Sequence, residues 1–135
     1  NQVRVVVVAP DGQPGDLLRL GTLEAQVMDV LWDHGPATVR EVIKCLPSEP
    51  AYTTIATVLS NLHRKGLVTI ARRNHSTSYE ARMSRHEHAA ALMEQVLSAS
   101  RDRTASILQF VDSMSDSDLD LLRDYLKRRD REEDR

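Results

Sequence analysis

The sequence contains a single cysteine, Cys45, among 135 residues. One cysteine cannot close an internal disulfide or build a cysteine zinc cluster, which agrees with a reducing compartment. Long apolar runs are missing as well: the longest spans only Val5 to Ala9, whereas a membrane helix needs about 20 residues. No apolar stretch with a cleavage site resembles a signal peptide. We therefore expect a cytoplasmic protein without membrane insertion.

Patterns typical of catalysis or metal binding are also missing. The histidines are scattered, and His86 and His88 are two residues apart on a predicted helix, so they point in different directions. Neither a glycine-rich phosphate loop nor a nucleophile elbow occurs. Cys45 on an apolar helix face and Trp32 at the end of a helix are interpreted as core residues. We expect no enzymatic activity, no metal and no cofactor.

The charge is nearly balanced overall but unevenly distributed. A net charge of −2 argues against a uniformly basic nucleic-acid coat. Residues 51–82 nevertheless carry five cations against one anion, a net charge of +4, whereas residues 112–135 carry nine acids against six bases. An anionic partner is expected to meet residues 51–82, although solvated helix faces often show similar imbalances.

The first residues differ in composition from the rest of the chain. Residues 1–17 combine a strand-like apolar run with clustered proline and glycine, so we interpret them as an N-terminal extension that is flexible or forms an edge strand. A first helix is predicted after Gly21, with Thr22 as its N-cap and Gly35 at its end. Thr38 and Glu41 match a capping box and predict the start of a second helix.

A third helix is predicted from Tyr52 to Lys65, and its two faces differ in chemistry. Its apolar residues fall within about 100° of one another. The opposite face gathers the polar side chains of Thr53, Thr54, Thr57, Ser60, Asn61 and Arg64. Hydroxyls contact phosphates or base edges, asparagine pairs with adenine, and arginine holds guanine or phosphate. We interpret this face as a DNA-reading surface; the alternative is an ordinary solvated helix face.

The apolar period then changes from 3.6 to about 2, which predicts a β-hairpin. Its strands are expected at Leu67–Ala71 and Thr77–Ala81, joined by a polar turn. The turn carries the expected backbone contacts Arg72, Arg73, Asn74 and His75. Three helices followed by a hairpin are typical of the winged-helix variant of the helix-turn-helix.

Three further helices are predicted after Ser84, which forms a second capping box with Glu87. The last helix begins after Ser115. Their apolar stripes lie on a segment too short to bury them alone, so a homodimer is expected. The expected interface residues are Leu92, Val96, Ile107, Phe110, Val111, Leu119, Leu122 and Leu126.

These residues together resemble the penicillinase repressor family of bacterial winged-helix regulators, the BlaI, MecI and CopY types. The resemblance extends from about Leu20 to Leu126 and includes Leu31-Trp32 and the run from Thr38 to Val42. Its most specific part is Ala51-Tyr52-Thr53-Thr54-Ile55-Ala56-Thr57-Val58-Leu59. It implies a homodimeric repressor whose C-terminal helices interlock and whose recognition helices and wings bind an inverted-repeat DNA operator. The implied contacts are Thr53, Thr54, Thr57, Arg64 and Arg73.

Two family features differ in this chain. The copper-responsive members resemble one another in a cysteine-rich tail, whereas Lys127 to Arg135 contains no cysteine, so copper sensing is not expected. The antibiotic-responsive members share an Asn-Phe bond that a membrane sensor protease system cuts. The matching pair here is Gln109-Phe110, which makes it the candidate cleavage site.

The expected fold is therefore mainly α with a small β-hairpin. We expect a winged helix-turn-helix DNA-binding domain at 18–82 and a helical dimerisation region at 83–135. The expected function is transcriptional repression by a homodimer on a double-stranded operator. The alternative is a winged-helix protein-interaction module in which the basic wing is incidental; a ligand-sensing regulator is weaker because no apolar pocket can be inferred.

Overall fold

The computed structural model describes residues 18–134, so the expected N-terminal extension lies outside the described residues. The chain divides into two compact units, with the boundary between Gln95 and Val96. The first unit reaches into the helix after the hairpin and so extends past residue 82. The functional division into residues 18–82 and 83–135 remains a separate prediction.

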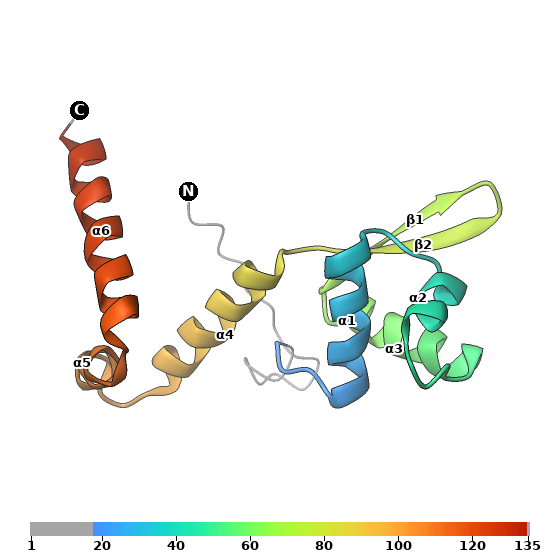
Figure 1. The fold of residues 1–135 in the computed structure, drawn as a ribbon. Helices are drawn as coiled ribbons and strands as arrows, with labels where there is room; N and C mark the ends of the chain where they lie inside the picture. Colours follow the sequence, from blue (N-terminus) through green and yellow to red (C-terminus); the bar gives the residue numbers. More distant parts are fainter. Residues whose placement is uncertain (1–17, 135) are drawn as a thin grey trace. The chain divides into compact units, whose positions relative to one another are not determined.

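The first unit is a winged helix, as the sequence predicts. Three helices, α1 (Thr22–His34), α2 (Val39–Cys45) and α3 (Tyr52–Arg64), are followed by the antiparallel strands β1 (Val68–Arg73) and β2 (Ser76–Ala81). The hairpin projects beyond the three helices (Figure 1). The helix α4 (Arg85–Ala99) begins in this unit.

The core of this unit forms where the apolar faces of the three helices meet. The side chains of Val27, Val42, Ile55, Leu59 and Leu62 are fully buried. This confirms the apolar face predicted for α3. Close packing of this kind makes large-to-small changes costly, at about 2–5 kcal/mol for a buried leucine cut to alanine. The exposed face of α3 is therefore held on a rigid support.

Capping interactions define where the helices begin. Gly21, not Thr22 as predicted, is the N-cap of α1, because its N–H donates to Glu24 Oε1 at 3.0 Å and Thr22 is already helical. The predicted capping box of α2 is confirmed: the Thr38 N–H donates to Glu41 Oε1 at 3.0 Å, and the Glu41 N–H donates to Thr38 Oγ1 at 3.2 Å. The Thr38 backbone N–H, and after it the Thr38 hydroxyl, hold the pKa of the Glu41 carboxyl below its ordinary value.

Two residues expected in the core are less buried than predicted. Cys45 is exposed, because Leu46 rather than Cys45 continues the buried stripe of Val39 and Val42 on the short helix α2. Trp32 packs against the core but is only partly buried, and its indole N–H donates to the carbonyl of Met83 at 2.9 Å.

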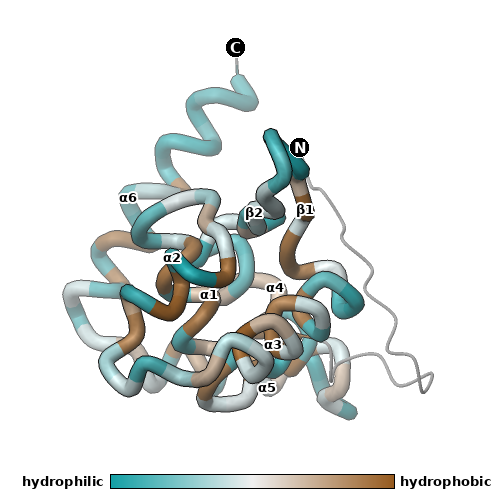
Figure 2. The backbone as a smooth tube through the Cα atoms, turned by 90° about the vertical axis from the view of Figure 1, so that its right-hand side faces the viewer, coloured by the Kyte–Doolittle hydropathy of each residue, from teal (hydrophilic) through white to brown (hydrophobic). Residues whose placement is uncertain are grey.

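The hairpin has longer strands and a tighter turn than predicted. Only Asn74 and His75 form the turn, with φ of 46° and 69°. Positive φ at both central residues is the geometry that matches the right-handed twist of paired strands. Arg72 and Arg73 therefore belong to β1, where they pair with Thr77 and Ser76. The tip of the hairpin is strongly hydrophilic (Figure 2).

The second unit contains the end of α4, then α5 (Arg103–Ser113) and α6 (Asp116–Glu133). Asp102 caps α5, and Ser115 caps α6 as predicted by accepting from the Asp118 N–H at 3.2 Å. Neither α5 nor α6 contains a buried residue. The last turns of α6 are hydrophilic (Figure 2).

Candidate nucleic-acid interface

The exposed face of α3 is the centre of the candidate interface. The six residues predicted for it lie on one helix whose opposite side, at Ile55, Leu59 and Leu62, is fully buried. Asn61 is half-buried, and the other five are exposed: Thr53, Thr54, Thr57, Ser60 and Arg64. Hydroxyl, amide and guanidinium groups thus face solvent from a helix that cannot rotate without exposing its core.

The hydroxyl of Thr57 is already engaged within the helix. It donates to the Thr53 carbonyl at 2.8 Å, one turn earlier. A hydroxyl has one hydrogen, so this bond leaves the exposed Thr57 side chain with acceptor lone pairs and a methyl group for other contacts. Thr57 is therefore suited to apolar contact with a thymine methyl or to accepting from a base.

Sequence reasoning missed a contact between α2 and the start of α3. Ala51 is the N-cap and has no side-chain acceptor for the first-turn N–H groups of Thr53 and Thr54. Tyr52 is 52% exposed, and the Arg40 guanidinium lies 5.6 Å from the centroid of its ring. The signal in the sequence was an arginine early in α2 followed by a tyrosine at the first turn of α3. Arg40 of α2 thus places a guanidinium beside the first turn of α3.

The hairpin supplies the second part of the candidate interface. Arg72, Arg73, Asn74 and His75 are all exposed. Successive side chains of a strand point to opposite faces. Arg72 and Arg73, both in β1, therefore do not form the compact turn cluster predicted from the sequence, and only one of them can face a given surface. The Ser76 hydroxyl closes the turn by donating to the Arg73 carbonyl at 2.9 Å.

Residues 51–82 carry a net positive charge, but one of their five cations, Lys65, is paired with a carboxylate of α1. No acidic residue occurs between Glu49 and Glu80 in the sequence. Lys65 Nζ, however, lies 2.8 Å from Glu24 Oε2, and both side chains are more than four-fifths buried. Lys65 therefore ties the end of α3 to the start of α1, and the exposed cations of the stretch are Arg64, Arg72, Arg73 and Arg82.

The second unit exposes a large share of its apolar side chains. Among the predicted interface residues, Val96 is 66%, Phe110 56%, Leu126 46% and Ile107 39% exposed. Val111, Leu119 and Leu122 are half-buried, as is Leu92, which lies in the first unit. Leu108 and Leu121 are also exposed, although neither is among the predicted interface residues. These positions leave α5 and α6 without a core of their own.

The candidate cleavage bond lies inside a helix. Gln109 and Phe110 are both exposed residues of α5, which runs from Arg103 to Ser113. Peptide bonds within a helix are protected from proteases unless the helix opens locally.

Across residues 18–134, none of the helices is apolar over a length that would span a bilayer.

The three helices and the hairpin that follows them place the chain in the winged-helix class. The penicillinase repressor family model matches residues 20–128. The "Transcriptional regulator BlaI" of Mycobacterium tuberculosis, in strains CDC 1551 and H37Rv, is 39% identical over 113 residues, which cover 79% of this chain and 82% of the relative. The chain therefore belongs to the penicillinase repressor family, and it is a transcriptional regulator of the BlaI type.

Two solved structures are also similar to this chain. A MarR family protein from Bacillus stearothermophilus has a TM-score of 0.45 at 17% identity, covering 89% of this chain and 81% of that chain. A possible transcriptional regulator for arsenical resistance has a TM-score of 0.48 at 20% identity, covering 75% of this chain and 96% of that chain.

Proposed function

We propose that this protein is a cytoplasmic repressor that binds an inverted-repeat operator as a homodimer. In this proposal α3 enters the major groove and the hairpin contacts the sugar-phosphate backbone. The observation that carries it is the face of α3, where hydroxyl and guanidinium groups are exposed on a helix anchored by fully buried residues. That face lies in a stretch without acidic residues, so no carboxylate of the stretch repels phosphate.

The second unit supports the homodimer. The helices α5 and α6 bury no residue, and Phe110 and Val96 are more than half exposed. Apolar surface on this scale marks an interface, because a small unit cannot gain enough from burial to order itself alone. A two-fold dimer presents two copies of α3 in opposite orientation and therefore requires two half-sites in opposite orientation.

A binding titration tests the proposal against the rival protein-interaction module. A labelled duplex from upstream of the protein's own gene is compared with a scrambled duplex of the same composition, at two salt concentrations. The proposal predicts tighter binding to the upstream duplex and a loss of affinity as salt rises, because phosphate contacts release counterions. Equal binding to both duplexes, or none, contradicts operator recognition and favours the interaction module.

Release from the operator by proteolysis stays a prediction. A cut between Gln109 and Phe110 removes Phe110, Val111 and all of α6 from the protomer. The shortened chain loses dimer contacts and holds only one half-site, which lowers operator affinity because the two half-sites no longer act together. A membrane sensor protease system is the partner that this proposal requires. Mass spectrometry of the protein from cells exposed to a cell-wall antibiotic detects or excludes the cut.

A further inference from the structure

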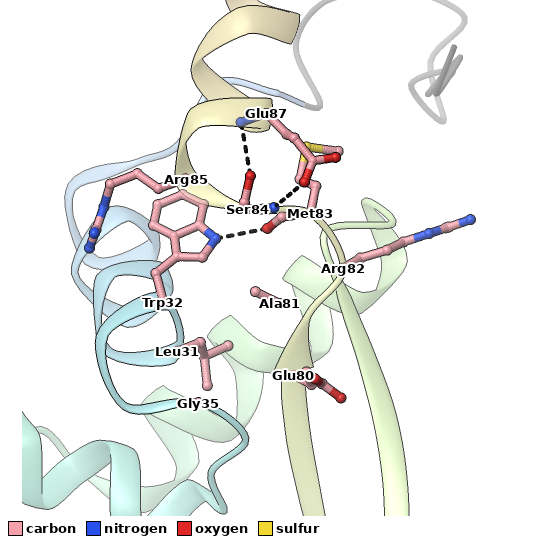
Figure 3. Close-up of a pocket in the computed structure, with 10 residues that line it drawn as sticks. All are labelled: Leu31, Trp32, Gly35, Glu80, Ala81, Arg82, Met83, Ser84, Arg85 and Glu87. Atoms are coloured by element: carbon pink, nitrogen blue, oxygen red, sulfur yellow. Dashed lines mark hydrogen bonds between the residues drawn. The ribbon is translucent and has the colours of Figure 1, made fainter. Parts of the chain in front are cut away.

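The base of α4 is attached to α1 by a cluster of contacts that the DNA-reading face does not use. Arg85 Nη2 lies 2.9 Å from Asp33 Oδ1 and 3.3 Å from Asp29 Oδ1. The guanidinium carbon of Arg85 also lies 5.2 Å from the centroid of the Trp32 ring. In Figure 3 the Arg85 side chain extends alongside Trp32 at the first turn of α4. Arg85 thus contacts three residues of α1.

Two hydrogen bonds, made by Trp32 and His88, also hold the start of α4 in place. The Trp32 indole N–H donates to the carbonyl of Met83, directly before α4, at 2.9 Å (Figure 3). The ring of His88, one turn into α4, lies 5.5 Å from the Trp32 ring and is 94% buried. Its Nε2 is 2.8 Å from the Leu18 carbonyl. Trp32 and His88 therefore belong to a packed and hydrogen-bonded contact, which resists rotation.

The helix cap fixes the first turn of α4 in the same place. The Glu87 N–H donates to Ser84 Oγ at 3.1 Å, and the Ser84 N–H donates to Glu87 Oε1 at 3.2 Å. The Ser84 hydroxyl, and after it the Ser84 backbone N–H, hold the pKa of the Glu87 carboxyl below its ordinary value. The N-cap of α4, Ser84, thus directly follows Met83, whose carbonyl accepts from the Trp32 indole.

We propose that Trp32, Arg85 and His88 form a joint that sets the direction in which α4 leaves the winged helix, and thereby the spacing of the two half-sites that the dimer accepts. The inference rests on the proposed homodimer. In the proposed complex with DNA, Arg85 and Trp32 are positioning residues that do not touch the DNA. One continuous helix, α4, runs from this joint into the second unit, so a change of its direction moves one reading face relative to the other.

The requirement for a stiff joint follows from DNA geometry. One extra base pair between half-sites moves the second half-site by about 3.4 Å and rotates it by about 35°. A dimer with a fixed joint fits one spacing, whereas a loose joint fits several and loses the advantage of binding both half-sites at once. The two ion pairs of Arg85 are weak on their own, because more than half of each side chain is exposed to solvent. The Trp32 and His88 contacts hold α4 against α1, and Arg85, which contacts Asp29, Asp33 and the Trp32 ring at once, limits how far α4 turns about them.

The single cysteine allows a direct test. Cys45 is exposed in α2 of the winged helix, so a spin label there reports the distance between the two winged helices of a dimer by double electron–electron resonance. The variants are Arg85→Ala, which removes the exposed bridge, and Trp32→Phe, which keeps an aromatic ring but loses the donor to Met83. The matched control is Arg101→Ala, which removes an exposed arginine in the turn after α4.

Wild type and the control are expected to give one narrow distance distribution, and both joint variants one at least about twice as broad. The variants are also expected to bind a single half-site within about twofold of wild type but the full operator about tenfold more weakly. A distance distribution of unchanged width in the joint variants would overturn the proposal that these residues fix the direction of α4. A broad distribution in wild type would overturn it as well. Arg85 is exposed, so Arg85→Ala carries the test even where Trp32→Phe does not fold. A wild type without any inter-label distance is a monomer, which contradicts the proposed homodimer instead.

Discussion

The hydroxyl of Thr57 donates to the carbonyl of Thr53 at 2.8 Å on the exposed face of α3. The hydrogen is therefore engaged, and the methyl group is the part of Thr57 available for a thymine contact. We predict that Thr57→Ala costs about 1–3 kcal/mol of operator binding, whereas Thr57→Val, which keeps the methyl group, costs much less. Fluorescence anisotropy titrations of the three proteins measure this difference.

The base contact has its own control. Replacing thymine by uracil in the operator removes the methyl group from the DNA side, and it should weaken wild type but not Thr57→Ala. Equal loss of operator and random-duplex binding in Thr57→Ala would falsify its base-reading role.

Arg73 is expected to act on the backbone instead of the bases. It is exposed next to the tip of the hairpin and pairs with Ser76 across the strands. We predict that Arg73→Ala weakens operator and random duplexes alike and reduces the slope of log affinity against log salt by about one. Arg64→Ala is the comparison: it should lose about 1–3 kcal/mol on the operator and discriminate bases less well. A sequence-dependent loss in Arg73→Ala would assign this side chain to base reading.

Leu122 lies half-buried on α6, a helix that buries no residue completely. We predict that Leu122→Asp dissociates the homodimer, because burying a carboxylate without a partner costs more than the interface gains from the position. Analytical ultracentrifugation at micromolar concentration measures the oligomeric state. Ser117→Asp adds the same charge at an exposed polar position of α6 and should remain dimeric. A dimeric Leu122→Asp places the interface elsewhere.

Acid is expected to weaken the start of α2. The Thr38 backbone N–H and hydroxyl lower the pKa of Glu41 from its ordinary value of 4.5. A group with a lowered pKa in the folded state stabilises the fold above its ordinary pKa, and this stabilisation is lost as the pH falls through the folded pKa. Urea unfolding at a series of pH values should therefore show wild type losing stability below pH 4.5. Glu41→Gln, which does not titrate, should lose less; parallel profiles would contradict the role of this carboxylate.

The helices and their caps could be predicted because the interactions that form them are local. The capping boxes at Thr38 and Ser84 join residues three apart, so the pattern is visible in the sequence. The ion pair of Lys65 joins it to Glu24, 41 residues away, and no spacing rule indicates it. The hairpin was predicted too short because positive φ at Asn74 and His75 tightens the turn to two residues.

The candidate DNA face could be predicted more fully than its surroundings. Five of the six predicted residues of α3 are exposed, since one helix period determines which side is buried. The pairing of Arg40 with Tyr52 depends on how α2 packs against α3 and was missed. The contact of Trp32 with His88 likewise depends on the placement of α4.

The most direct test of the central claim is selection of bound duplexes from a random-sequence pool, followed by sequencing. A homodimer that reads DNA with two copies of α3 is predicted to enrich one short half-site in two inverted copies at a fixed spacing. The Arg64→Ala variant should enrich a motif altered at the same position of both copies. An enriched site with a single asymmetric half, or a pool without any enriched motif, would contradict the homodimeric operator-binding repressor.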